Sequence, residues 1–298
     1  MIFVTGATGR VGSAIIEALG PRIDVRGACR ERVDRPGTTH RTTFDFQEPE
    51  GFSAALDGVS AVFLMRPPQI AKAAVFHPFL EALKARRIRR IVMLSVAGAD
   101  RNPLLPHHGM ETLIQRPEFD WTILRPSDFM QNLETVHADA IREHDEIAVP
   151  ASNGRSAFVD VADLGGVGSR VLTEPGHIGK AYRLTGPEAL SFTDVAEILT
   201  AVLGRSISYR SPGLWRFIRD QRRAGAPLSL ALVMSALYTI QRLGGAAEVT
   251  GDLARLLGRE PTRFRTYAVR QRRAWLEADD AAREGMIGGL NTMKRSQP

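Results

Sequence analysis

The sequence predicts an α/β protein with a doubly wound parallel sheet and a smaller, mainly helical C-terminal portion. In the first half of the chain, short apolar runs alternate with segments of helical period. A glycine-rich loop separates the first apolar run from the first helical segment. Strands that alternate with helices form βαβ units, and right-handed crossovers place the helices on both faces of one parallel sheet.

Six strands and four helices are predicted before residue 127. The strands are expected over Ile2–Thr5, Asp24–Cys29, Thr42–Phe46, Val59–Met65, Arg90–Ser95 and Trp121–Leu124. The helices are expected over Val11–Leu19, Phe52–Leu56, Ala71–Arg87 and His108–Gln115. Gly20-Pro21, Pro67-Pro68 and Pro126 end elements, because proline removes a backbone donor and glycine admits sharp turns.

The second half is less regular. Ser191 is a favourable N-cap for a helix that ends at Gly204, and the chain is mainly helical from Gly213 to Asp280. Short strands are expected over Glu146–Val149, Ala157–Val159, Ala181–Leu184 and Ser206–Tyr209, and helices over Val161–Leu172 and Phe192–Leu203.

Charge and composition exclude several classes. The net charge is +6, but the arginines are scattered and no nucleic-acid motif accompanies them, so no nucleic-acid partner is expected. Cys29 is the single cysteine, which rules out an internal disulfide and fits a reducing cytoplasm. The apolar run Leu228–Ile240 is too short to span a membrane and is expected to be a buried or groove-lining helix, so no membrane partner is expected.

The first loop has the pattern of a dinucleotide site. Gly6 allows a tight turn, and Gly9 allows the close approach of a pyrophosphate. Gly12 allows close packing of the helix. The helix N-terminus then offers free N–H groups to the phosphates. We therefore expect a Rossmann-type domain whose cofactor contacts in this loop are Gly6, Thr8, Gly9, Arg10, Val11 and Gly12.

The end of the second strand indicates NADP(H) rather than NAD(H). A site selective for NAD usually has an acidic residue there, to bind the ribose 2′-hydroxyl. This chain has Arg30 at that place, and Arg32 and Arg35 follow. Guanidinium groups pair well with the additional 2′-phosphate of NADP. The predicted 2′-phosphate ligands are Arg30 and Arg35.

Further cofactor contacts are expected at the carboxyl ends of the parallel strands. Asp45 and Phe46 are expected beside the adenine. Around the ribose and nicotinamide we expect Met65, Arg66, Ser95 and Pro126. The domains then divide as an NADP-binding domain over residues 1–145, with strands also contributed from 156–186, a substrate-binding α/β portion over 146–280, and a mobile tail over 281–298.

Several motifs along the chain resemble the NmrA-like group of atypical short-chain dehydrogenases/reductases. They are the glycine loop with the strand before it, Ile91–Ala99, Asp120–Asn132, Phe158–Asp163, Leu184–Ser191 and Pro261–Phe264. The resemblance extends to about Leu276. It implies a Rossmann fold, a nicotinamide cofactor and the same cofactor contacts. Relatives of this group include quinone, azo-dye and triphenylmethane-dye reductases.

The usual catalytic acid of short-chain reductases is absent. None of the four tyrosines has a lysine four residues on, and none lies between the fifth and sixth strands. That segment contains His107 and His108 instead. We expect His108 to donate the proton, Ser95 to orient the substrate, and Met130 and Asn132 to contact it. No spacing of residues indicates a metal site.

Three functions remain open from the sequence. The first is an NADPH-dependent oxidoreductase that passes hydride to a quinone-like, azo or conjugated aromatic acceptor. The second is an NADP-sensing regulator that binds a protein partner and has no turnover. The third is a reductase that tailors secondary metabolites. A quinone-like acceptor is compatible with the absence of a catalytic tyrosine. Its reduction gives a phenolate-like product whose conjugate acid has a pKa of about 10, so solvent can protonate it.

Overall fold

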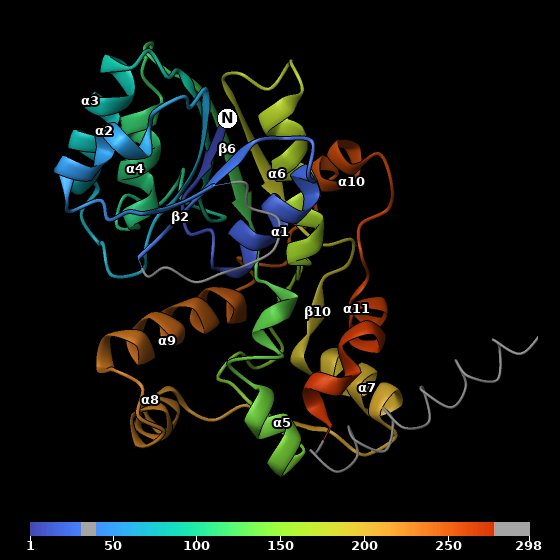
Figure 1. Ribbon diagram of the computed structural model, residues 1–298. Coiled ribbons are helices and arrows are strands. Elements are labelled where there is room, and N and C mark those ends of the chain that lie inside the picture. The colour runs from blue at the N-terminus through green and yellow to red at the C-terminus, as the bar shows by residue number, and fades with distance from the viewer. Residues whose placement is uncertain (31–39, 277–298) are drawn as a thin grey trace, which may run out of the picture. The chain divides into compact units, whose positions relative to one another are not determined.

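Seven parallel strands form the largest sheet of the protein, in the order β3-β2-β1-β4-β5-β6-β9 (Figure 1). The computed structural model describes residues 1–30 and 40–276. The strands are β1 Ile2–Val4, β2 Val25–Cys29, β3 His40–Thr43, β4 Ala61–Met65, β5 Arg90–Leu94, β6 Asp120–Pro126 and β9 Lys180–Leu184. The predicted doubly wound parallel sheet is therefore confirmed.

The chain divides into two compact units that interleave along the sequence. Unit 1 comprises Met1–Phe129, Val159–Pro187 and Val249–Pro261, and contains the large sheet. Unit 2 comprises Met130–Phe158, Glu188–Glu248 and the residues from Thr262 onward. The predicted tail over 281–298 lies outside the described residues.

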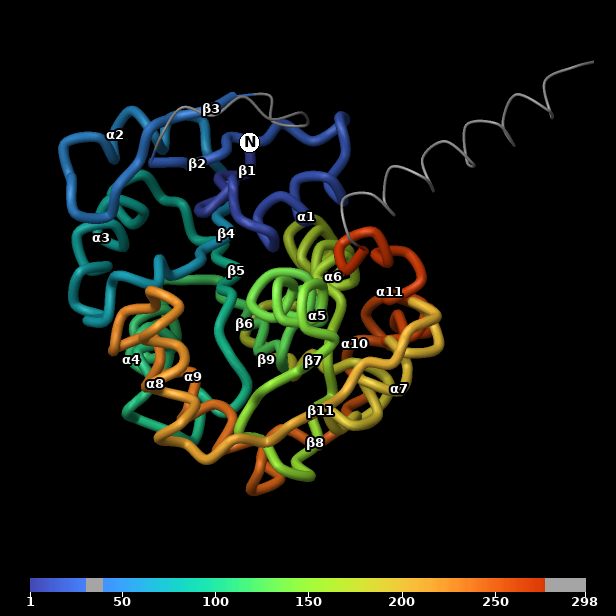
Figure 2. Tube along the Cα trace, turned by 90° about the horizontal axis from the view of Figure 1, so that it is seen from below, coloured from blue at the N-terminus to red at the C-terminus, as the bar shows by residue number. Residues whose placement is uncertain are grey.

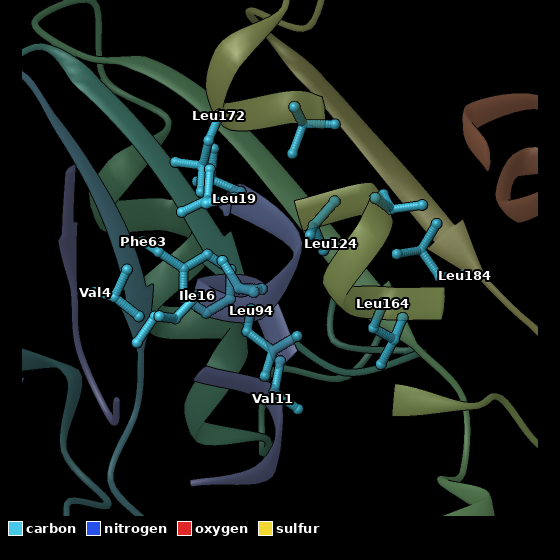
Figure 3. Close-up of a cluster of buried hydrophobic side chains, with 14 of the residues drawn as sticks. Val4, Val11, Ile16, Leu19, Phe63, Leu94, Leu124, Leu164, Leu172 and Leu184 are labelled. Carbon is cyan, nitrogen blue, oxygen red and sulfur yellow. The ribbon is translucent and has the colours of Figure 1, made fainter. Parts of the chain in front are cut away.

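Helices cover both faces of the sheet in unit 1 (Figure 1). On one face, α1 (Arg10–Leu19) and α6 (Val161–Thr173) pack together over a core of aliphatic side chains from β1, β4 and β5 (Figure 3). The short α10 (Asp252–Leu257) packs against α6 and β9. The other face carries η1 (Pro49–Gly51), α2 (Phe52–Ala55), η2 (Ala73–Phe76), α3 (His77–Ala85) and α4 (Pro106–Ile114). Strands buried on both faces are apolar, as β4 is throughout and β5 is after Arg90.

The third strand ends earlier than predicted. We expected it over Thr42–Phe46, but β3 stops at Thr43. The next residues leave the sheet because Phe44 and Phe46 enter an aromatic cluster with Phe79, at ring-centroid distances of 5.3 Å from that ring. The N–H of Phe44 still donates to the Cys29 carbonyl of β2 at 3.0 Å, so the chain departs from the sheet after this residue. Asp45 and Phe46 consequently follow the strand instead of ending it.

The long helix predicted over Ala71–Arg87 is divided. The structure has the 3₁₀ turn η2 and then α3, which begins at His77. Pro78 explains the division, because a residue without an N–H fits only in the first turn of a helix. Pro106 starts α4 in the same way, two residues before the predicted His108.

Unit 2 has its own core and two small sheets. Strand β10 (Leu190–Ser191) pairs antiparallel with β8 (Arg155–Ser156), and β11 (Ser208–Arg210) pairs parallel with β7 (Glu146–Ala148). The core gathers Trp275, Tyr267, Phe192 and aliphatic side chains around them. The helices are η3 Met130–Asn132, α5 Ala138–His144, α7 Phe192–Leu203, α8 Leu214–Arg223, α9 Leu228–Arg242, α11 Phe264–Gln271 and η4 Arg272–Trp275.

The strand predicted over Ala157–Val159 does not form. Its first residue follows β8 and donates its N–H to the Ala246 carbonyl at 3.0 Å. Val159 makes an isolated parallel bridge with Phe129. Among the described residues, no helix is both long and apolar enough to cross a membrane.

The strand order reverses between β1 and β4, because the chain winds outward from β1 in both directions. In open α/β sheets, ligands bind outside the carboxyl ends of the strands at such a reversal. We therefore expect the ligand site at the loops that follow β1, β2, β4, β5 and β6, all in unit 1.

Candidate cofactor and active site

The loop after β1 has the conformation that its glycines predict. Gly6 has φ +62°, which favours glycine, and its carbonyl accepts the Gly9 N–H at 2.9 Å. A Cβ atom on Gly6 would lie 2.1 Å from the Met65 Cε atom. The loop therefore turns tightly under the end of β4.

The N-terminus of α1 is fitted to receive an anion. Gly9 occupies the N-cap and has no side chain to cap the first turn, and no acidic residue lies in that turn. A Cβ atom on Gly12 would lie 2.3 Å from the Gly6 carbonyl oxygen, so only glycine lets the helix start this close to the loop. Thr8 is half-buried, Arg10 is exposed and Val11 is buried in the core. Free N–H groups and the positive end of the helix dipole suit a pyrophosphate.

Two hydroxyl groups that the sequence analysis missed hold this loop in place. The buried Thr5 hydroxyl donates to the Phe63 carbonyl at 3.1 Å and accepts the Met65 N–H at 2.7 Å. The Ser13 hydroxyl donates to the Ala7 carbonyl at 3.0 Å. They link the loop to β4 and to α1. The available signal was a polar side chain next to the first glycine, at the end of an apolar strand.

The predicted 2′-phosphate ligand Arg30 directly follows β2 and is exposed. Arg35 lies outside the described residues. Asp45 is half-buried, and its Oδ1 atom accepts the Gln47 N–H at 2.9 Å. The ring of Phe46 is buried 4.6 Å from the ring of Phe76. Of the pair predicted beside the adenine, Asp45 thus has the more accessible side chain.

The Arg66 side chain after β4 is anchored to its own loop. Its Nη1 atom donates to the carbonyls of Pro67, Pro68 and Ile70, the last at 2.7 Å. Its Nε atom donates to His107 Nε2 at 3.5 Å. Burial lowers the pKa of Arg66 below its ordinary value. The arginine therefore fixes the shape of the loop after β4 and brings that loop against α4.

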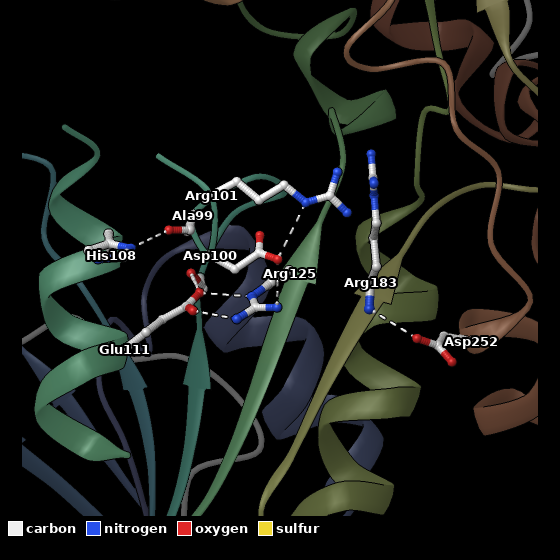
Figure 4. A network of polar contacts seen from close by, with 9 residues as sticks. Ala99, Asp100, Arg101, His108, Glu111, Arg125, Arg183 and Asp252 are labelled. Atoms are coloured by element: carbon white, nitrogen blue, oxygen red, sulfur yellow. Dashed lines mark hydrogen bonds and ion pairs between the residues drawn. The ribbon is translucent and has the colours of Figure 1, made fainter. Parts of the chain in front are cut away.

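A polar network lies at the carboxyl ends of β5 and β6 (Figure 4). The Ser95 hydroxyl is buried and donates to the carboxylate of Glu111, which is itself only 3% exposed. Arg125 binds the same carboxylate through two hydrogen bonds, of 3.0 and 2.6 Å. Its remaining nitrogen faces Asp100 at 3.5 Å. The hydrogen bond to Glu111 raises the pKa of Arg125.

This network changes the interpretation of Ser95. From the sequence we expected the Ser95 hydroxyl to orient a substrate. In the structure this hydroxyl donates a hydrogen bond to Glu111. Glu111 was not predicted as a site residue. A carboxylate in a predicted helix does not by itself indicate that it will bind an arginine of a later strand. Ser95, Glu111 and Arg125 thus connect α4 to the ends of β5 and β6.

The two histidines of α4 differ in their surroundings. Burial, together with the charge of Arg66, lowers the pKa of His107 to about 4, so this ring is neutral at pH 7. His108 Nδ1 lies 2.8 Å from the Ala99 carbonyl (Figure 4). Because a carbonyl only accepts, Nδ1 carries the hydrogen of this contact. Both rings are half-buried.

The other predicted residues lie in both units. Pro126 ends β6, is buried, and accepts the Ala97 N–H at 2.9 Å. Met130 and Asn132 belong to η3 in unit 2. Met130 is fully buried in the core of that unit, and Asn132 is half-buried. Within residues 1–30 and 40–276, no group of three histidine, cysteine or acidic side chains is arranged to hold a metal.

Comparisons with known proteins identify the family of the chain. The NAD(P)H-binding family matches residues 6–164, which is more than half of the chain. An NAD(P)H azoreductase of Xenophilus azovorans is 31% identical over 90% of this chain and 96% of its own. Agroclavine dehydrogenase of Claviceps fusiformis is 31% identical over 93% of this chain and 99% of its own.

A solved structure extends the comparison to the fold. The NADPH-dependent quinone oxidoreductase of Escherichia coli, crystallised with NADPH, is 26% identical with a TM-score of 0.80, and the match covers 91% of this chain and 99% of that one. The relatives and the structure agree with the NmrA-like resemblance of the motifs. The chain therefore belongs to the NAD(P)H-binding family and is an NAD(P)H-dependent oxidoreductase with a Rossmann fold.

Proposed function

We propose that the protein transfers a hydride from NADPH to a quinone-like, azo or other conjugated aromatic acceptor. The names of an azoreductase and a quinone oxidoreductase among its relatives support this acceptor class. The proposal depends on the hydrogen bonding and burial of the polar side chains after β5. The catalytic acid of an ordinary short-chain reductase is expected in this segment.

The residues present fit the cofactor. Glycines 6, 9 and 12 let the loop pack closely on β4 and on the start of α1, because Cβ atoms at these positions would lie 2.1–3.2 Å from Met65 or from the Gly6 carbonyl oxygen. Arg30 would bind the 2′-phosphate, and Asp45 would contact the adenosine part. The loops after β4 and β5, together with Pro126, would hold the ribose and the nicotinamide. When bound, NADPH supplies the hydride, and the protein positions the acceptor.

Among the described residues after β5 and in α4, the polar side chains are already engaged with one another. Both Glu111 oxygens accept hydrogen bonds from Arg125, and one also accepts from Ser95, so this carboxyl group is occupied within the protein. His107 is neutral at pH 7 because burial lowers its pKa to about 4. An isolated carbonyl needs a proton as it receives hydride, because its alkoxide is a strong base. A quinone or azo acceptor spreads the charge over a conjugated system, so later protonation by solvent is sufficient.

His108 is our candidate for passing that late proton. Its ring is half-buried, and its Nδ1–H is fixed on the Ala99 carbonyl, which leaves Nε2 as the ring nitrogen available to a product. Ser95 and Glu111 are positioning residues that keep α4 against β5 and β6. Replacement of His108 with alanine is expected to lower kcat by about 10²-fold if the transfer limits turnover. An unchanged kcat would remove this histidine from the mechanism.

The acceptor class is tested by following loss of NADPH absorbance at the nicotinamide band. A panel should contain a benzoquinone, an azo dye, a conjugated enone and an unconjugated aldehyde. We expect turnover with the conjugated acceptors and none with the aldehyde. Turnover with no acceptor, together with tight NADPH binding, would favour the regulator over the enzyme.

The cofactor preference is tested by calorimetry. Arg30→Ala is expected to weaken NADPH binding by about 10-fold or more and to leave NADH binding nearly unchanged, because only NADPH has the 2′-phosphate. Arg22→Ala, at an exposed arginine of unit 1, is the matched control. Tenfold tighter binding of NADH than of NADPH to the unmodified protein would contradict the preference.

A further inference from the structure

The helical hairpin formed by α8 and α9, residues Leu214–Leu243 in unit 2, has an unusual surface. Figures 1 and 2 show the two helices side by side, and Phe217 of α8 meets Tyr238 of α9 at a ring-centroid distance of 5.6 Å. From the sequence we expected the apolar run in α9 to be buried or to line a groove. The structure instead exposes 44–56% of each large apolar side chain along it, at Leu228, Leu230, Leu232, Val233, Leu237 and Ile240.

The exposed face of α8 combines tryptophan with arginine. Trp215 is 86% exposed, and four arginines accompany it, at positions 216, 219, 222 and 223. At 100° per residue, these five side chains fall within an arc of about 120°. The opposite side of the helix carries the buried Phe217. The arrangement is that of an amphipathic helix whose polar face is basic and holds one large aromatic ring.

The charge of the hairpin is strongly positive. Residues 214–243 contain five arginines and a single acidic residue, Asp220, which gives a net charge of +4. Asp220 pairs with Arg216 at 3.7 Å and with Arg219 at 3.3 Å, and Arg222 also donates to the Ala226 carbonyl. The hairpin thus carries exposed leucines together with a net positive charge that internal ion pairs only partly offset.

This charge decides which partner the surface fits. A second copy of the chain, docked about a two-fold axis, would place the same +4 hairpin against itself. An anionic lipid surface would instead attract the arginines and receive the leucines and Trp215 at the level of the headgroups. We propose that the hairpin Leu214–Leu243 binds the surface of an anionic bilayer, lying in the interface without crossing it.

The test uses the full-length protein and vesicles, with no acceptor present, so its outcome is separate from that of the proposed function. Vesicles of phosphatidylcholine are compared with vesicles of phosphatidylcholine and phosphatidylglycerol by co-sedimentation. We expect binding to the anionic vesicles, weakened by salt. Tryptophan fluorescence is expected to shift to the blue on binding, and Trp215→Phe is expected to abolish that shift.

Matched charge reversals make the test specific. The double variant Arg222→Glu/Arg223→Glu is expected to lower partitioning by at least about 30-fold. The control Arg22→Glu/Arg116→Glu makes the same change in net charge at exposed sites of unit 1 and is expected to partition within about twofold of the unmodified protein. Retained NADPH binding and an unchanged thermal midpoint show that each variant is folded.

Three results would overturn the proposal. One is the absence of binding to anionic vesicles at low salt. Another is an equal loss of partitioning in both double variants, which would indicate attraction by overall charge alone. The third is a stable dimer in sedimentation equilibrium that Val233→Ser/Leu237→Ser dissociates, without vesicle binding, because a second copy would then cover the surface.

Discussion

Replacing Gly12 with alanine tests whether the start of α1 must lie against the glycine loop for NADPH to bind. The added Cβ atom would lie 2.3 Å from the Gly6 carbonyl oxygen and 2.9 Å from the Gly6 carbonyl carbon. Ordinary contact begins at 3.4 Å, so the oxygen would have to retreat by about 1.1 Å. Both groups are backbone, so no side-chain rotation relieves the clash. Overpacking of this kind costs about 1–3 kcal/mol of stability.

The same displacement moves the N–H groups that would face the pyrophosphate. A misplacement of about 1 Å can cost about 10²-fold in function, so we expect NADPH affinity to fall by about 100-fold. Calorimetric titration with NADPH measures the affinity, and urea unfolding measures the stability. The control is Gly51→Ala, where a Cβ atom would meet nothing within 4 Å. An alanine variant at position 12 with unchanged NADPH affinity and stability would refute the reasoning.

Two other predictions concern buried polar groups. Glu111→Ala leaves Arg125 without its buried partner and is expected to cost about 3–5 kcal/mol in urea unfolding, whereas Ser95→Ala costs about 1 kcal/mol; equal effects would argue against the network. The second rests on His137, which is buried in unit 2, accepts or donates one hydrogen bond with Tyr238 at 2.9 Å, and has its pKa lowered to about 4 by burial. The unfolded chain takes up this proton near pH 6.5, so the stability is complete above that pH and falls by up to about 3 kcal/mol as the pH drops toward 4. His107 also has its pKa lowered to about 4 and contributes a similar dependence. His137→Asn is therefore expected to remove about half of the stability loss between pH 6.5 and 4, and a variant with the original pH profile would contradict it.

Much of the fold follows from local sequence. Alternating apolar and helical segments predicted the parallel sheet, and Gly204 and Ser191 predicted the bounds of α7. Where the observed elements differ from the predicted ones, the cause is also visible in the local sequence. Pro78 starts α3, and Phe44 and Phe46 are too apolar to remain beside an exposed strand.

In the candidate site, too, some features could be predicted from the local sequence and others could not. The glycine loop was predictable because three glycines constrain backbone geometry within a few residues, and the conformation of Gly6 bears this out. The partners of Ser95 and Arg66 were not predictable. Ser95 bonds to a residue 16 positions away and Arg66 contacts one 41 positions away. Such contacts depend on which elements become neighbours in space.

The sequence by itself determined the doubly wound sheet, the dinucleotide loop and the absence of the usual tyrosine and lysine pair, because each is a matter of residue type at short spacing. Only the tertiary structure decided that the carboxylate of Glu111 lies between Ser95 and Arg125, and that the apolar side chains of α9 face outward. Both depend on burial. Whether a side chain is covered is set by elements far away in the chain, and no local pattern encodes it.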